Sequence, residues 1–428
     1  QPCQNVLAIL QFEHRIQRWR LGGAHHEHTH RHRQLRHLHA VSTNRFLDGS
    51  GDRGLVPGAV GQFLGQGLQR RTDRIGDVVL TTPALEVLRQ AYPQAKISMM
   101  VTPLTKDIVD LNPFLDEVIV YDKKGADKGF FNFWRFISKL KTKRFDLAIN
   151  YHLKSRMNLL LFHAGIPNRI GFKNEKLGFL LTEQYPDPRT DGQKHEAEYC
   201  LDLLKHIGIE YKNFHVRVSV HEDSEKWVDE IFKQHGILPG DKLIAIHPGA
   251  SCISKRWPPE RFGDVADRLA EKYQSKVLLI GSGDNQLIAR EVLITMKQPV
   301  IDMTGKTTVS HLISVLKRCT LLISNDSGPV HLAVGVETPV ISIFGRNQLG
   351  LSASRWKPLG LFDIALHRDV GCKVCLAHLC ELNFKCLKSV TVEHVLEAAD
   401  DIFHKLGHVP VLIEDLSQDN TKREEEIY

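Results

Sequence analysis

A cluster of polar residues that could hold a phosphate group lies near position 326 of this 428-residue chain. It follows an apolar run at residues 321–323, which predicts a buried parallel strand, and Pro329 then favours the first turn of a helix. The free N–H groups and the positive dipole end at a helix start can bind a phosphate. The candidate binding residues are Asn325, Asp326, Ser327, Gly328 and His331. A turn that binds no ligand is the alternative, and a lone histidine one helical turn later fits packing as well as binding.

Two further loops follow predicted strands in the same half of the chain, at residues 247–257 and 281–285. The first carries Ser251 and Lys255, and cations beside a phosphate-holding helix start can neutralise a diphosphate. A solvated basic loop is the alternative. The second carries Gly281, part of a weak dinucleotide-binding fingerprint, and Asp284, which could bind a ribose hydroxyl.

A single carboxylate stands out in the first half of the chain. Asp77 follows Gly76 at the start of a predicted helix, and a carboxylate facing a phosphate site across a cleft could act as a general base. The more common role of an aspartate at such a position is to cap the helix. The order of residues alone does not decide between the two roles.

These candidates are positioned by two series of alternating strands and helices. The first series has predicted strands at residues 97–101, 118–121 and 145–150, and the second at 243–247, 277–280, 321–323 and 340–344. Alternation of this kind predicts an α/β fold with parallel sheets covered on both faces, whose ligands bind at the carboxyl ends of the strands. A turn at residues 238–241 suggests domains at 70–236 and 237–410, followed by a polar tail at 411–428.

Residues 1–69 differ from the remainder of the chain. They contain a histidine-rich tract at 25–39 and a glycine-rich stretch at 49–67, and they lack the features of a signal peptide. We expect a disordered leader or an artefact of the translation start, with metal binding by the histidines as a weaker alternative. The formal net charge of +6 does not imply a nucleic-acid partner, and no apolar run reaches the length of about 18 residues that a membrane span needs.

Four cysteines lie close together near the end of the second series, at Cys372, Cys375, Cys380 and Cys386. Four cysteines at short spacing resemble a structural zinc site. Reduced thiols and disulfides are the alternatives, and disulfides are disfavoured in a cytosolic protein.

Four segments together resemble the ADP-heptose–lipopolysaccharide heptosyltransferase family, glycosyltransferase family 9. They are residues 74–85 (RIGDVVLTTPAL), 247–250 (HPGA), 255–258 (KRWP) and 325–331 (NDSGPVH). The resemblance implies the GT-B fold, in which two Rossmann-like domains face one another across a cleft. By position, Asp77 matches the catalytic aspartate and Lys255 the lysine that contacts the donor phosphates. Asp326, Ser327, Gly328 and His331 match the donor-binding turn.

The resemblance also implies the reaction and its partners. An ADP-sugar donor would bind the second domain, and the lipopolysaccharide inner core would bind the first, with inversion at the sugar and no required cofactor. The enzyme would be cytoplasmic and peripheral at the inner face of the inner membrane. The first domain could present a basic surface to the acceptor, and solvated helix faces are the alternative. The basic residues are Lys123, Lys124, Lys128, Lys141, Lys143, Arg144, Lys154 and Arg156. Of these, Lys154 and Arg156 are the acceptor-binding candidates. A sugar-nucleotide epimerase or hydrolase, or a silent nucleotide-binding protein, remains an alternative.

One feature departs from the family pattern. The family has an apolar strand directly before the aspartate loop, whereas residues 61–70 here contain three glycines and only three large apolar residues. Glycine weakens a central strand. The sequence therefore predicts lower stability or activity than an apolar strand at this position would give.

Overall fold

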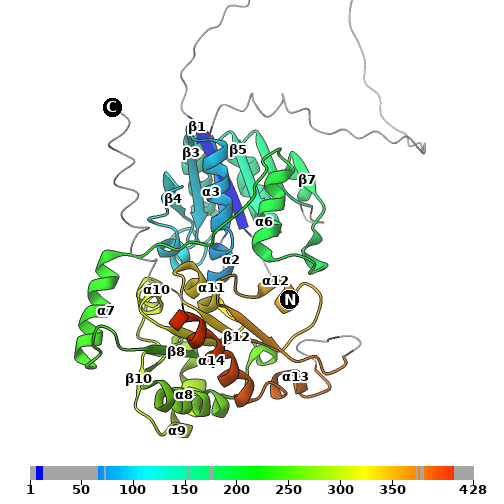
Figure 1. The fold of residues 1–428 in the computed structure, drawn as a ribbon. Coiled ribbons are helices and arrows are strands. Elements are labelled where there is room, and N and C mark those ends of the chain that lie inside the picture. Colours follow the sequence, from blue (N-terminus) through cyan, green and yellow to red (C-terminus); the bar gives the residue numbers. More distant parts are fainter. Residues whose placement is uncertain are drawn as a thin grey trace, which may run out of the picture.

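The computed structural model describes residues 6–12, 66–71, 74–151, 154–173, 177–372, 375 and 380–408. These residues form two α/β lobes, drawn one above the other in Figure 1, and each is built on one mainly or wholly parallel sheet. The fold class predicted from the alternating pattern is therefore confirmed.

The sheet of the first lobe has seven strands in the order β4-β3-β1-β2-β5-β6-β7. Strand β1 runs antiparallel to β2 and β3, whereas β2 to β7 pair in parallel. The strands are β1 (Val6–Phe12), β2 (Gln66–Arg71), β3 (Ala95–Val101), β4 (Glu117–Val120), β5 (Leu147–Tyr151), β6 (Asn168–Phe172) and β7 (Glu183–Tyr185).

Strands β1 and β2 correct the expectation that residues 1–69 take no part in the fold. Strand β2 fills the place of the apolar strand that the sequence seemed to lack, because Gly67 pairs in parallel with Leu147 of β5. Ala8 of β1 pairs with Met99 of β3. The sequence of β1, VLAILQF, has the continuous apolar character of a central strand. The histidine-rich tract and the tail at 411–428 lie outside the described residues.

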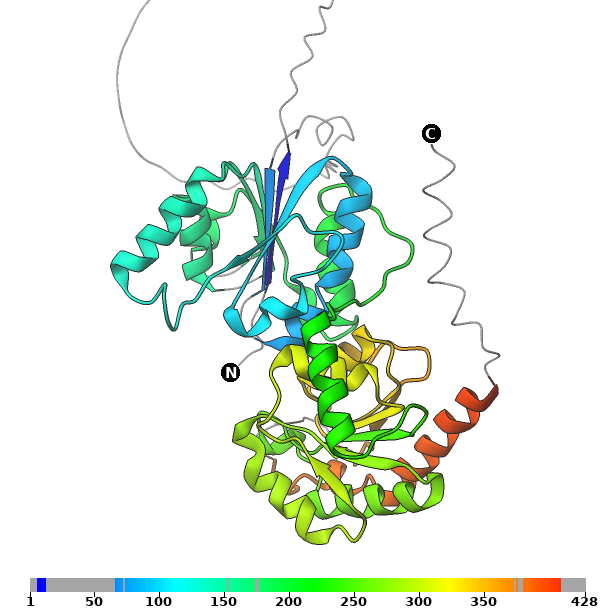
Figure 2. The same cartoon turned by 90° about the vertical axis from the view of Figure 1, so that its left-hand side faces the viewer.

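Helices cover both faces of this sheet (Figure 2). Helices α4 and α5 pack on one face through Phe136 and Leu160, and α3 and α6 pack on the other through Leu85 and Leu204. The helices of the lobe are α2 (Ile75–Val79), α3 (Thr82–Ala91), α4 (Phe130–Thr142), α5 (Ser155–His163) and α6 (Glu196–Lys205), with 3-10 turns η1 (Pro103–Ile108), η2 (Gly178–Leu180) and η3 (Pro188–Thr190).

The sheet of the second lobe has six parallel strands in the order β10-β9-β8-β11-β12-β13. They are β8 (Leu243–His247), β9 (Lys276–Leu279), β10 (Val300–Asp302), β11 (Leu321–Asn325), β12 (Val340–Phe344) and β13 (Ile364–His367). Every residue of β8, β11 and β12 is buried, as expected for strands covered on both faces.

Helices also cover both faces of the second sheet. Helices α8 (Pro259–Tyr273), α9 (Gln286–Thr295) and α14 (Val392–His408) pack on one face. Helices α7 (Glu222–Gln234), α10 (Val309–Lys317) and α11 (Gly328–Gly335) pack on the other. The remaining short elements are α12 (Ala353–Trp356), α13 (Lys385–Lys388), η4 (Ile253–Lys255) and η5 (Gly283–Asn285).

The two lobes share one apolar core. Val78 and Val79 of α2 belong to the same buried cluster as Val330 and Leu332 of α11. Helix α7, which the boundary at residue 237 would place with the first domain, packs on α10, where the ring of Trp227 stacks 4.0 Å from that of His311. Among the described helices, none combines the length and the apolar character that crossing a bilayer requires.

Candidate active site

The candidate residues follow the strands at which each sheet changes its direction of winding. In the second sheet β8 and β11 are neighbours, and the chain continues from them toward opposite edges. In the first sheet β2 and β5 are paired in the same way. Ligands of open α/β sheets bind outside the carboxyl ends of strands at such switch points. The loops after β8 and β11, and the segments after β2 and β5, carry most of the predicted site.

The three predicted loops of the second lobe come together. The side-chain amide of Asn325 donates to the carbonyl oxygen of Pro248 (2.7 Å), and its Oδ1 accepts from the backbone N–H of Trp257 (3.0 Å). Asn285 packs on Gly249, where a Cβ atom would lie 2.5 Å from the Asn285 Oδ1 atom. Because both ends of the buried Asn325 amide bond to the neighbouring loop, this side chain positions the loop.

A buried charge cluster lies beside the start of α11. The Lys255 Nζ atom is 2.6 Å from Asp326 Oδ2 and also donates to the Asp326 carbonyl oxygen at 3.2 Å. Arg346 Nη2 donates to the same Oδ2 atom at 3.2 Å. Burial alone would raise the pKa of Asp326, but the two cations outweigh it and hold that pKa below its ordinary value. Two cations around one carboxylate leave a positive charge that suits an anionic ligand.

The hydroxyl groups beside this cluster are held by a buried histidine. His247 Nδ1 lies 3.1 Å from Ser324 Oγ and 3.0 Å from Ser327 Oγ. Burial lowers the pKa of His247 to about 4, so the ring is neutral near pH 7. Ser327 is the N-cap residue of α11 but makes no side-chain capping bond. The first N–H groups of α11 therefore lie next to Lys255 and Ser327, as a phosphate site requires.

Asp77 lies in α2, directly across from this helix start. The N-cap residue of α2 is Arg74, so the alternative in which Asp77 caps the helix is wrong. Gly76 packs so closely on the ring of His331 that a Cβ atom at position 76 would lie only 2.6 Å from His331 Cδ2. A Cβ atom on Gly328 would likewise lie 3.1 Å from the Cβ atom of Ile75. The turn that carries Asp77 is thus in contact with the helix that carries Ser327 and His331.

The other predicted residues lie on the segments that follow β5, β8 and β9. Ser251 and Asp284 are exposed on their loops, and Gly281 lies against Asn285. Lys154 is the N-cap residue of α5, and the guanidinium of Arg156 lies 4.5 Å from the ring centre of Phe133. Both cations follow the carboxyl end of β5, on the same edge of the sheet as Asp77.

Two residues of the site were not predicted from the sequence. Arg346 belongs to the charge cluster, and His247 contacts the hydroxyl groups of Ser324 and Ser327 beside it. Arg346 follows the carboxyl end of β12, next to β11 in the sheet, and its place after a predicted strand was a usable signal. His247 was part of a recognised motif, but its burial and its contact with Ser327 depend on the pairing of β8 with β11.

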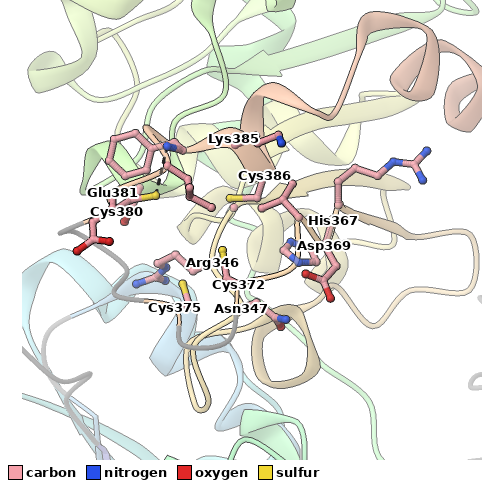
Figure 3. A pocket seen from close by; sticks show the side chains of 16 residues that line it. Arg346, Asn347, His367, Asp369, Cys372, Cys375, Cys380, Glu381, Lys385 and Cys386 are labelled. Atoms are coloured by element: carbon pink, nitrogen blue, oxygen red, sulfur yellow. Dashed lines mark hydrogen bonds between the residues drawn. The ribbon is translucent and has the colours of Figure 1, made fainter.

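The four clustered cysteines line a pocket of about 230 Å³ next to Arg346 (Figure 3). All of the described cysteines are free thiols, so no disulfide forms among them. Within the described residues, no group of three or more His, Cys, Asp or Glu side chains is arranged to hold a metal ion. Burial raises the pKa of the Cys386 thiol. The donor set of the predicted zinc site is therefore not gathered, and zinc binding stays a prediction.

The chain is similar to known glycosyltransferases over most of its length. It is 28% identical over 336 residues to lipopolysaccharide heptosyltransferase 3 of Escherichia coli, covering 76% of this chain and 95% of that protein. A glycosyl transferase family 9 structure from Veillonella parvula matches with a TM-score of 0.72 and 27% identity, covering 78% of this chain and 96% of that one.

A second solved structure supports the fold. The E. coli ADP-heptose lps heptosyltransferase II matches with a TM-score of 0.65 and 20% identity, covering 78% of this chain and 97% of that one. The family profile described as glycosyltransferase family 9 (heptosyltransferase) matches residues 133–385, which is more than half of the chain. The chain therefore belongs to glycosyltransferase family 9, the family of the heptosyltransferases.

Proposed function

We propose that this enzyme transfers a heptose from ADP-heptose to the inner core of lipopolysaccharide, with inversion at the anomeric carbon. The observation that carries the proposal is the charge cluster of Lys255, Asp326 and Arg346 at the start of α11. The Gly76–Asp77 turn of the other lobe contacts the same helix at His331. A transferase of this kind needs a diphosphate site in one lobe and a base in the other. The names of the similar E. coli proteins, which include ADP-heptose and lipopolysaccharide, agree with this donor and acceptor.

In the proposed mechanism, Asp77 accepts the proton of an acceptor hydroxyl. The hydroxyl oxygen then forms a bond to the anomeric carbon as the bond from that carbon to the diphosphate breaks. ADP leaves with the bonding electron pair. Lys255, Arg346 and the N–H groups at the start of α11 stabilise the negative charge that grows on the diphosphate. Because these groups carry the charge compensation, the mechanism assigns no step to a metal ion.

The acceptor would enter along the edge of the first sheet that carries Asp77. Lys154 and Arg156 lie on that edge after β5 and would contact anionic groups of the inner core. An acceptor anchored in lipid would place the enzyme at the cytoplasmic face of the inner membrane as a peripheral protein. In this proposal the acceptor hydroxyl reaches Asp77 from the first lobe, while the second lobe holds the donor.

The proposal is tested by replacing the base with its neutral isostere. We expect Asp77→Asn to lower turnover by about 10²- to 10⁴-fold, the range ascribed to general base catalysis, while ADP binding measured by calorimetry is unchanged. An equal loss of ADP binding would contradict the assignment of Asp77 as the base.

The reaction itself is tested with ADP-heptose in the presence and absence of the lipid-linked core. Release of ADP that depends on the acceptor supports transfer. Release without an acceptor would indicate a hydrolase, conversion of the sugar without release would indicate an epimerase, and binding without either would indicate a silent nucleotide-binding protein.

A further inference from the structure

Five neighbouring rings on α4 and α5 form a surface that we call the aromatic surface: the exposed Phe130, Phe131, Phe162 and His163, and the half-buried Trp134. Successive ring centres are 5.7 Å apart for Phe130 and Phe131, 6.0 Å for Phe130 and Trp134, 4.7 Å for Trp134 and His163, and 5.3 Å for His163 and Phe162. Phe130 is 70% exposed and Phe131 is 85% exposed. Large apolar side chains that gather on a surface in this way mark a site of contact with a partner.

The segment that carries most of the aromatic surface is strongly basic. Residues 121–144 contain eight basic and two acidic side chains, a net charge of +6, which equals the formal net charge of the whole chain. The basic residues are Lys123, Lys124, Lys128, Arg135, Lys139, Lys141, Lys143 and Arg144. Helix α4 itself has no acidic residue.

The acidic groups of this region are engaged within the fold. Asp122 accepts hydrogen bonds from the backbone N–H groups of Gly125 (2.8 Å) and Ala126 (3.0 Å). Asp127 accepts from the backbone N–H of Asp122 (2.8 Å). Lys143 pairs with Glu117 of β4, outside the segment. With eight basic and two acidic side chains, the segment carries an excess of positive charge.

The aromatic surface adjoins the edge of the lobe at which the acceptor would enter. Arg156 follows β5 on that edge, and its guanidinium lies over the ring of Phe133, whose centre is 5.9 Å from that of the next residue, Trp134. Figure 2 shows α4, in teal, on the outer side of the upper lobe, away from α3 and α6. The surface is thus continuous with the acceptor side of the proposed site and separate from the contact between the lobes.

We propose that the aromatic surface and its basic rim dock the first lobe on an anionic lipid bilayer. Aromatic rings settle at the boundary between head groups and acyl chains, and basic side chains around them are attracted to anionic head groups. This inference rests on the proposed function, because a lipid-linked acceptor requires the enzyme to work at a membrane. Charge complementarity favours an anionic bilayer over a second copy of this basic lobe.

The test is co-sedimentation of the full chain with vesicles of phosphatidylethanolamine and phosphatidylglycerol, compared with vesicles of phosphatidylcholine. We expect binding to the anionic vesicles that weakens as salt is raised. The double variant Phe130→Ser/Phe131→Ser should bind at least about tenfold more weakly, because two exposed rings no longer enter the interface. The matched control is Leu361→Ser/Ile294→Ser, since these second-lobe residues are 90% and 84% exposed, and it should bind as the unchanged protein does.

Activity measurements separate this inference from the proposed function. The Phe130→Ser/Phe131→Ser variant should keep its transfer rate on a deacylated, soluble core acceptor and lose it on an acceptor embedded in vesicles. The vesicle measurement remains valid even if ADP-heptose proves not to be the donor. Equal thermal unfolding of variant and unchanged protein shows that folding is preserved.

Three results would overturn the inference. The unchanged protein could fail to bind anionic vesicles, or the double serine variant could bind them equally well. Sedimentation velocity could also show a dimer that the same variant converts to a monomer, in which case the aromatic surface is covered by a second copy of the chain.

Discussion

Replacing Lys255 with methionine should separate the structural role of the charge cluster from its catalytic role. The Nζ atom lies 2.6 Å from the Asp326 carboxylate, whose side chain is only 6% exposed. Removing one partner of a buried ion pair costs roughly 3–5 kcal/mol. Arg346 remains 3.2 Å from the same oxygen and still compensates it, so we expect a loss below that range, about 2–3 kcal/mol, in the free energy of unfolding by urea. Loss of one charge-stabilising group should also lower kcat/KM by about 10²- to 10³-fold.

The double variant Lys255→Met/Asp326→Asn provides the decisive comparison. In the double variant Arg346 keeps its buried charge but loses its carboxylate partner, so the free energy of unfolding should stay below that of the unchanged protein. Its kcat/KM for transfer from ADP-heptose should stay as low as that of Lys255→Met, because the cation that faces the diphosphate is still missing. If the double variant regained full activity, Lys255 would act only by compensating Asp326, and its proposed role in stabilising the leaving group would be refuted.

Three further predictions concern other parts of the site. Gly76→Ala should lower turnover and thermal stability, because its Cβ atom would meet the ring of His331. The added change His331→Ala should restore part of the lost thermal stability. A Gly76→Ala protein with unchanged turnover and unfolding would contradict the close contact. The pKa of His247 is about 4 in the folded protein and 6.5 in the unfolded chain, so its contribution to stability is complete above about pH 6.5 and is lost as the pH falls toward 4. Urea unfolding at about pH 7.5 and about pH 5 should therefore show a loss that is about 2 kcal/mol smaller for His247→Gln than for the unchanged protein. Metal analysis of protein kept reduced should find about one zinc ion per chain if Cys372, Cys375, Cys380 and Cys386 form the predicted zinc site. Protein that contains no zinc and whose cysteines are modified by a thiol reagent would reject that prediction.

Local sequence patterns predicted the central unit of the second lobe well. The run at 321–323, the turn around Asp326 and the helix after Pro329 appear as β11 and α11, because burial and helix-start preferences are encoded within a few residues. The convergence of the three loops also followed from topology alone, since parallel strands share one carboxyl edge.

The features that were missed depend on contacts between distant segments. Strand β1 pairs with β2 and β3, which are far away in the sequence, and its sequence alone did not identify a partner. Arg346 became part of the site only because β12 pairs with β11. Asn325 was predicted to bind the donor, but its amide is occupied by Pro248 and Trp257 of another loop. Each case requires the pairing of strands before the role of the side chain can be assigned.

The apolar core that joins α2 to α11 has a consequence for how the protein melts. Val78 and Val79 lie in one buried cluster with Val330 and Leu332, so swinging the lobes fully apart would open this cluster to water, at a cost of roughly 1.5–3 kcal/mol for each such side chain that becomes fully exposed. Neither lobe would keep its buried surface without the other. Calorimetry should therefore record a single cooperative heat-absorption peak for the two lobes, and either lobe expressed alone should be prone to aggregation.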